Sequence, residues 1–108
     1  MQENLSEVKK KAEVLKKELE AKGFRIASVY LYGSHARGNW LKTSDIDLII
    51  ISDDFEGLKF LRRLDVVNEI IWRKNLGNLE VLPLTASEVE KEESAVIRDA
   101  KKYWKRIL

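Results

Sequence analysis

Residues 29–51 read VYLYGSHARGNWLKTSDIDLIII, and this stretch decides the fold. It opens and closes with short apolar runs that are rich in β-branched and aromatic residues, which favour strands. The closing run, residues 46–51, is almost continuously apolar and predicts a strand buried on both faces. The segment between the two runs is polar and carries two glycines. The stretch therefore predicts two strands joined by a loop that is a candidate for function.

A helix is expected on the N-terminal side of this stretch. Apolar residues recur at steps of three and four over residues 5–19, which is the spacing of an amphipathic helix. Asn4 can cap this helix, and Gly23 can end it in a left-handed conformation. The first strand is then expected over residues 24–31, and a short helix can follow Ser34.

Three elements are expected on the C-terminal side. Apolar spacing predicts a second helix over about residues 56–74, and residues 79–84 read as a third strand. Pro83 favours an edge strand or a strand end, because proline cannot donate a backbone hydrogen bond. Thr85 stands three residues before Glu88, a capping-box pattern that opens a final amphipathic helix over about residues 86–108.

The elements alternate between helix and strand along the whole chain. This order predicts an α/β or α+β fold, a small mixed β-sheet with helices packed on it. With 108 residues, the chain has the size of one domain, expected over residues 1–108. The motifs fall in a core of about residues 24–84, followed by the C-terminal helix.

The composition narrows the class of protein. A net charge of +2 is too balanced to indicate nucleic-acid binding, which argues against nucleic acid as a partner. The chain has no cysteine, which fits a reducing compartment. No run approaches the roughly 20 apolar residues of a membrane span, and the N-terminus is charged. We therefore expect a cytoplasmic protein that does not enter a membrane.

Asp45 and Asp47 stand two residues apart at the head of an apolar strand. Both carboxylates should lie on one face, with Cα atoms about 7 Å apart. Like charges this close repel unless a cation lies between them, and hard oxygen ligands suit Mg²⁺, with Mn²⁺ as a substitute. Because Mg²⁺ is usually completed by substrate phosphates, a nucleoside triphosphate is the expected co-ligand. Alternatively, the aspartates only cap a turn after Thr43 and Ser44.

The residues before this pair are candidates for phosphate binding. Gly33 and Ser34 stand where the first strand ends and a helix can begin, and free N–H groups there favour an anion. Gly33 lets the backbone approach a phosphate, and Ser34 adds a hydroxyl donor. Arg37 lies about one helical turn beyond and can assist with its charge, or it can pair with Asp45 in a purely structural role.

A third carboxylate would complete a two-metal site. Glu80 is the only acidic residue inside the third strand, so we assign it as a metal ligand and possible general base. Alternatively, it is a solvent-facing strand residue. Trp40 can stack on a base, but it can also pack in the protein core. His35 is expected to be an exposed loop residue.

Gly33-Ser34-x-Ala36-Arg37-Gly38 followed by Ser44-Asp45-Ile46-Asp47-Leu48 resembles the DNA polymerase beta nucleotidyltransferase superfamily, and within it the minimal nucleotidyltransferases. The resemblance covers about residues 29–84. It implies helices on one side of a small mixed sheet, Mg²⁺ dependence and transfer of a nucleoside monophosphate from a triphosphate. By the motif match, Gly33 and Ser34 take the phosphate role, and Asp45 and Asp47 bind the metal. Arg37 and Ser44 are further candidates for binding the nucleotide. Glu80 departs from the usual third aspartate.

The resemblance also implies a partner. The expected activity is transfer of AMP from ATP, or of another nucleotide, to a hydroxyl group on a partner protein such as a HEPN-type toxin, in an antitoxin role. A homo-oligomer is the other expected assembly. One alternative is a catalytically weak module that masks such a partner, with residues 103–108 as the contact surface. The other is an RNA-modifying or nucleotide-binding protein that uses its helical lysines.

Overall fold

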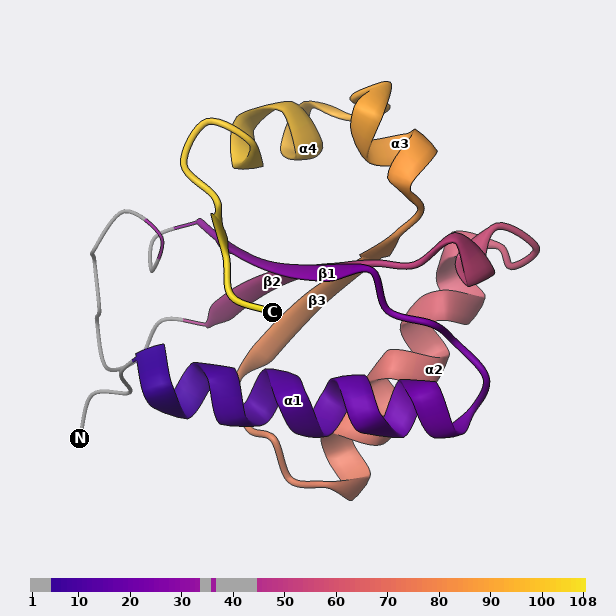
Figure 1. Ribbon diagram of the computed structural model, residues 1–108, viewed down its shortest axis with the longest axis vertical. Helices are drawn as coiled ribbons and strands as arrows, with labels where there is room; N and C mark the ends of the chain where they lie inside the picture. Colours follow the sequence, from indigo (N-terminus) through magenta and orange to yellow (C-terminus); the bar gives the residue numbers. More distant parts are fainter. Residues whose placement is uncertain (1–4, 34–35, 37–44) are drawn as a thin grey trace.

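The computed structural model describes residues 5–33, 36 and 45–108. Figure 1 shows a sheet lying between two pairs of helices, with one pair on each face. The predicted fold class, a small mixed β-sheet with helices packed on it, is confirmed.

The sheet has four strands in the order β3-β2-β1-β4. They are β1 (Ser28–Tyr32), β2 (Ile46–Ile51), β3 (Leu79–Leu84) and β4 (Lys105–Arg106). β2 pairs antiparallel with β1 and parallel with β3, and β4 pairs antiparallel with β1. β2 and β3 have the predicted boundaries, whereas β1 starts later than predicted. Pro83 lies near the end of an edge strand, as its missing N–H group predicted.

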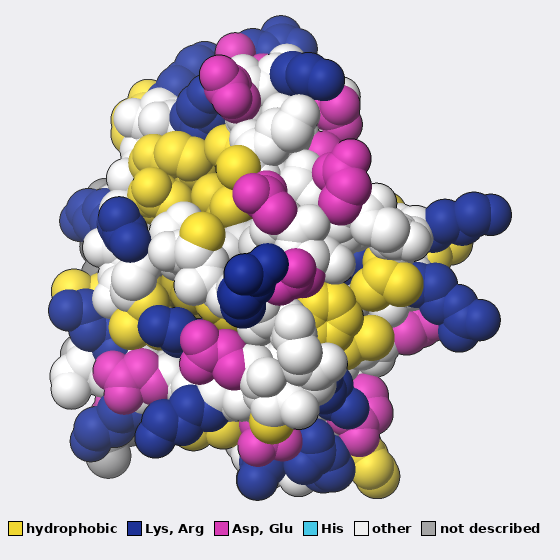
Figure 2. All heavy atoms as spheres, turned by 45° about the vertical axis from the view of Figure 1, so that its right-hand side comes forward, with side chains coloured by type: hydrophobic (Ala, Val, Ile, Leu, Met, Phe, Trp, Pro, Cys, Tyr) yellow, Lys and Arg dark blue, Asp and Glu magenta, His cyan; other side chains and the backbone are white. Residues whose placement is uncertain are grey.

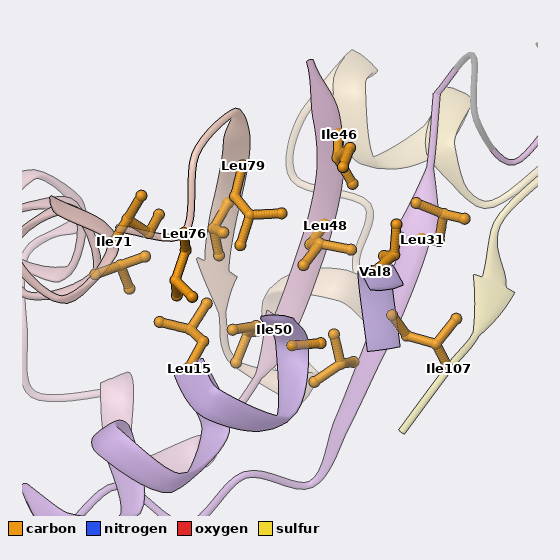
Figure 3. Packing of buried hydrophobic residues seen from close by; sticks show 14 of the residues in the cluster. Val8, Leu15, Leu31, Ile46, Leu48, Ile50, Ile71, Leu76, Leu79 and Ile107 are labelled. Atoms are coloured by element: carbon orange, nitrogen blue, oxygen red, sulfur yellow. The ribbon is translucent and has the colours of Figure 1, made fainter. Parts of the chain in front are cut away.

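Helices α1 (Leu5–Ala21) and α2 (Phe60–Arg73) pack on one face of the sheet. Gly23, at a φ of 98°, follows the end of α1 as predicted. Figure 3 shows Val8 and Leu15 of α1 packing against alternate residues of β1 and β2. These strand residues are Leu31, Ile46, Leu48 and Ile50. Burial contributes about 1.5–3 kcal/mol for each side chain of this size. Among the described residues, none of the helices combines the length and apolar character that a membrane crossing requires.

The helix predicted over residues 56–74 begins later, with α2. A short 3-10 turn, η1 (Asp53–Phe55), comes first, and Ser52 caps this turn. The Oγ atom of Ser52 accepts a hydrogen bond from the N–H group of Asp54 at 3.2 Å. The turn carries the fully buried ring of Phe55 into the main core, which explains why the chain does not become helical earlier.

Two short helices, α3 (Ala86–Glu90) and α4 (Ala95–Ala100), cover the opposite face of the sheet. They bury a second, smaller apolar cluster made of Ile49, Ile51, Leu84, Val89, Ile97 and Ala100. The expectation that the helices lie on one side of the sheet is therefore wrong for this chain.

The single C-terminal helix predicted over residues 86–108 is also wrong. Thr85 and Glu88 do form the predicted capping box. The helix nevertheless ends at Glu90, and Glu92 adopts a left-handed φ of 50° that turns the chain before α4 begins.

After α4 the chain crosses to the free edge of β1. β4 pairs with β1, and the N–H group of Ile107 donates to the carbonyl of Val29 at 2.9 Å. Trp104 stacks on Tyr30, with ring centroids 3.9 Å apart. Because an unpaired strand edge leaves backbone donors and acceptors unsatisfied, this pairing outweighs the helical spacing of the sequence.

Most of the apolar residues at 103–108, which were expected to form a contact surface, pack within the protein itself. Ile107 is only 6% exposed, and Trp104 packs on the second cluster, whereas Tyr103 is 51% exposed. The segment therefore does not present the continuous apolar surface that was expected.

A buried arginine ties α2 to β3 and α3. Arg63 is 4% exposed, and its Nε atom donates to the carbonyl of Leu58 at 2.9 Å. Its Nη1 atom donates to the carbonyl of Pro83 at 3.2 Å and to Oε1 of Glu88 at 2.7 Å. The same Glu88 oxygen accepts from the N–H group of Thr85 at 2.8 Å. Because a buried charge is tolerated only when it is paired, these bonds determine how the end of β3 meets α3.

Candidate active site

The parallel pairing of β2 with β3 brings two of the predicted acidic residues into one row across the sheet. Asp47 in β2 stands beside Glu80 in β3 and, on its other side, beside Tyr32 in β1. Side chains alternate between the two faces of a strand, and the neighbours of Asp47, Ile46 and Leu48, point into the core under α1 and α2. The row therefore lies on the face that α3 and α4 partly cover.

Asp45 extends this row toward the preceding loop. It is exposed, directly precedes β2 and stands two residues from Asp47, which places both carboxylates on one face. Both carboxylates are close enough to Glu80 for their charges to raise its pKa. The structure thus brings together the three acidic residues that the sequence singled out.

Repulsion within this acidic row changes the proton affinity of its members. The charge on Asp45 raises the pKa of Glu80, with desolvation and the charge on Asp47 adding to the effect. Burial raises the pKa of Asp47, and the charge on Asp45 adds to this while a hydrogen bond from Glu80 opposes it. Carboxylates this close favour a cation between them.

Tyr32 is a neighbour of the acidic row that sequence reasoning missed. Burial raises the pKa of its phenol to about 12, with the charges of Asp47 and Glu80 adding to the effect. The hydroxyl group therefore stays protonated at neutral pH and remains a hydrogen-bond donor. Tyr32 stands directly before Gly33, at the end of a strand, and this position in the sequence could have indicated that it lies in the site.

Gly33 follows β1 directly beside Asp47. Its φ of 74° lies in the left-handed region that favours glycine. A Cβ atom at this position would collide with Oδ2 of Asp47 and lie 3.3 Å from its Cγ atom. Only a residue without a Cβ atom allows the backbone to lie this close to the Asp47 carboxylate.

We expect Gly33→Ala to destabilise the protein more than the same change at other glycines. The left-handed conformation alone costs about 1–2 kcal/mol, and the collision with Asp47 adds to this. Gly23→Ala is a matched control with a φ of 98° and no atom within 4 Å of its Cβ, and Gly57→Ala has neither strain nor contact. Denaturant unfolding should rank the losses Gly33, Gly23, Gly57; equal losses at Gly33 and Gly23 would contradict the close approach.

The remaining predicted site residues lie outside the described residues. These are Ser34, Arg37 and Ser44, together with His35 and Trp40. Their roles stay predictions.

The donor set of the acidic row fits a hard divalent cation. Within residues 5–33, 36 and 45–108, no three His, Asp or Glu side chains stand close enough around one point to hold a metal ion as they are. Three neighbouring carboxylates nevertheless supply the oxygen ligands that Mg²⁺ and Mn²⁺ prefer, and the charge on Asp45 raises the pKa of Glu80, a repulsion that a cation would relieve.

Comparison with known proteins identifies the family. A family model described as a nucleotidyltransferase domain matches residues 8–107. The chain belongs to the nucleotidyltransferase domain family. Its acidic row and the glycine beside it lie within the matched region.

Relatives of this nucleotidyltransferase domain include a provisionally named protein adenylyltransferase of Methanocaldococcus jannaschii. It is 38% identical over 64 residues, which make up 59% of this chain and 62% of that protein. The match therefore spans less than two thirds of the relative's length.

Two solved structures show the same fold. A provisionally assigned nucleotidyltransferase from Sulfolobus solfataricus is 27% identical, with a TM-score of 0.54 and 82% of each chain covered. A structure described as a toxin-antitoxin with AMP-PNP is 18% identical, with a TM-score of 0.62, and the match covers 93% of this chain and 72% of that one.

Proposed function

We propose that this chain is a magnesium-dependent nucleotidyltransferase that moves AMP from ATP, or the corresponding part of another triphosphate, to a hydroxyl group on a partner protein. The observation that carries this proposal is the row of Asp45, Asp47 and Glu80 beside the side-chain-free backbone at Gly33. Nucleotidyl transfer needs a cation site next to a surface for phosphates, and this arrangement supports the proposal of both. Membership of the family and the name of the relative support the proposal.

Asp45, Asp47 and Glu80 would hold the metal, with Mn²⁺ as a substitute for Mg²⁺. When bound, the ion neutralises charge on the triphosphate and polarises the reacting phosphoryl group. A site of two or three carboxylates leaves coordination positions for phosphate oxygens, which suits a triphosphate substrate.

Gly33, Ser34, Arg37 and Ser44 would bind the triphosphate. The backbone at Gly33 would approach a phosphate from a position beside Asp47, where a Cβ atom does not fit. The two serine hydroxyl groups would donate hydrogen bonds to phosphate oxygens, and the Arg37 guanidinium would add charge-assisted hydrogen bonds.

In the proposed reaction, the acceptor oxygen attacks the α-phosphorus of ATP, and the bond from that phosphorus to the oxygen that bridges to the β-phosphate breaks. Pyrophosphate leaves with the bonding electrons, and the hydroxyl proton passes to a carboxylate oxygen of Glu80. Glu80 suits this role because it is exposed on the edge strand β3, where an acceptor can approach.

The acceptor is proposed to be a partner protein of the HEPN type, which would give the chain an antitoxin role. The name of the relative, a protein adenylyltransferase, supports a protein acceptor. The fold itself also occurs in a structure described as a toxin-antitoxin with AMP-PNP.

Calorimetric titration of ATP and the other triphosphates tests this function. With Mg²⁺ present, one triphosphate should bind the intact protein and fail to bind the Asp45→Asn, Asp47→Asn double variant. Asp65→Asn, an exposed aspartate on α2, is the matched control and should bind normally. If no triphosphate binds the intact protein, the alternative of a module that masks its partner without catalysis takes its place.

Glu80→Gln is expected to lower the rate of AMP transfer by about 10²-fold or more, since it removes the proposed proton acceptor. Glu80→Asp should keep a rate within about tenfold of the original, because it retains the carboxylate. The measurement is release of pyrophosphate under saturating ATP. A rate unchanged in Glu80→Gln would instead make Glu80 a solvent-facing strand residue.

A further inference from the structure

An apolar groove lies on the same face of the sheet as the acidic row. Its volume is about 430 Å³, and its apolar lining comes from α2, β3 and α4: Phe60, Leu82, Leu84, Val96 and Ile97. Leu82 connects the two features, because it stands two residues after Glu80 on β3 and therefore shares its face. The groove thus begins one side chain away from the proposed proton acceptor.

The edge of β3 beside this groove has free backbone groups. In the parallel pairing with β2, alternate residues over 78–84 turn their backbone groups toward β2. The N–H and C=O groups of Leu79 and Val81 therefore point outward, and no described residue pairs with this edge. Pro83 has no N–H group, and its carbonyl accepts from Arg63. The free edge therefore spans the part of β3 that flanks Glu80.

The charged side chains that line the groove are acidic. Its charged lining residues are Glu88 and Glu93, and no lysine or arginine of the described residues lines it. Glu88 is paired with Arg63, whereas Glu93 and the nearby Glu90 are exposed. Figure 2 shows acidic side chains grouped beside apolar ones in the upper half of the molecule, which is the half that holds α3 and α4 in Figure 1. A ligand with basic residues would complement this rim.

We propose that the acceptor polypeptide binds here as an added strand along β3. Its backbone pairs with Leu79 and Val81, its hydroxyl residue lies next to Glu80, and an apolar side chain enters the groove next to Leu82. Lysine or arginine residues two positions before the hydroxyl residue and two positions after the apolar residue share their face and meet the acidic rim. Because side chains alternate along a strand, the apolar residue stands two positions from the hydroxyl residue. This inference rests on the proposed function, since it describes how the same site receives its acceptor.

Two synthetic peptides test this geometry in the full-length protein. Lys-Gln-Tyr-Gln-Leu-Gln-Lys places leucine two positions from tyrosine, and Lys-Gln-Tyr-Gln-Gln-Leu-Gln-Lys places it three positions away, on the other face. In NMR titrations without ATP, the first peptide should shift the amide signals of Leu79 and Val81 and the methyl signals of Leu82, Val96 and Ile97. The second peptide should bind at least about tenfold more weakly, the cost of losing one buried apolar side chain.

A matched pair of surface variants completes the test. Val96→Arg should raise the Kd of the first peptide about tenfold, because it places a charged side chain in the groove. Val14→Arg changes an exposed valine of α1, on the opposite side of the sheet, and should leave the Kd unchanged. No shift with the first peptide, or equal affinity for both peptides, would overturn the inference.

The same samples separate this inference from the proposed function. Binding of the first peptide without AMP transfer, when Mg²⁺ and ATP are supplied, would contradict the function and leave strand addition standing. Transfer with the same peptide KM for both spacings and for Val96→Arg would overturn the inference and leave the function standing. Groove methyl signals that shift with adenosine, or with protein concentration alone, would overturn it in favour of a base subsite or a second copy.

Discussion

Asp47→Asn is expected to reduce the rate of AMP transfer by about 10³-fold, which is the loss seen when a group that stabilises transition-state charge is removed. Asp47 is the central member of the acidic row, with Glu80 on one side and Tyr32 on the other. The variant keeps the shape of the side chain but removes its negative charge, so the loss reports on charge. The measurement is pyrophosphate release with saturating Mg²⁺ and ATP.

The control is Asp65→Asn, which makes the same chemical change on the exposed surface of α2 and should keep the original rate. Thermal unfolding of each variant shows whether the fold is retained. Asp47→Asn should not be less stable, because it removes a like charge from a repulsive group. A folded Asp47→Asn protein with the original rate would show that the aspartates only cap a turn.

Glu88→Gln is expected to lower the free energy of unfolding by about 3 kcal/mol, because it leaves the buried Arg63 guanidinium without its carboxylate. Glutamine can still accept the hydrogen bond from the backbone of Thr85, so the capping box is kept and the loss reports on charge. Chemical denaturation measures the change. Against a total stability of about 5–15 kcal/mol, it is a large loss.

The matched control is the double variant Arg63→Met, Glu88→Gln. Removing both charges should recover most of the loss, since methionine fills much of the space of the arginine without requiring a partner. The loss of unfolding free energy in the double variant could instead equal the sum of the losses in Arg63→Met and Glu88→Gln. The hydrogen bonds of Arg63 to Leu58 and Pro83, rather than its charge pair, would then hold α2 against β3.

This ion pair also predicts how stability depends on pH. Burial pushes the pKa of the Glu88 carboxyl upward, but hydrogen bonds from Arg63 and from the backbone of Thr85 outweigh it and leave the pKa lowered. A lowered pKa in the folded state gives stability that is present above the ordinary carboxyl pKa, about 4.3 for glutamate, and is lost as the pH falls through the folded value. The difference in unfolding free energy between the original protein and Glu88→Gln should therefore shrink below about pH 4.

Several elements could be predicted because their signals are local. The apolar runs at residues 46–51 and 79–84 became β2 and β3 with the expected boundaries, and Thr85 with Glu88 forms the expected capping box. These signals depend on neighbouring residues, through side-chain shape, periodicity and short-range hydrogen bonds. The three acidic residues could be singled out for the same reason, since each lies on or beside an apolar strand.

Contacts between residues far apart in the sequence could be learned only from the tertiary structure. The parallel pairing of β2 and β3 places Glu80 beside Asp47. Residues 105 and 106 pair with the edge of β1 and form a strand, although their spacing predicted a helix. Local sequence therefore determined β2, β3, the capping box and the candidate acids, whereas the sheet determined which acids lie side by side and that the chain ends in β4 rather than in a helix. The physical reason is that strand edges and buried charges are satisfied only by groups brought together by the fold, and no local pattern in a single sequence shows which ones they will be.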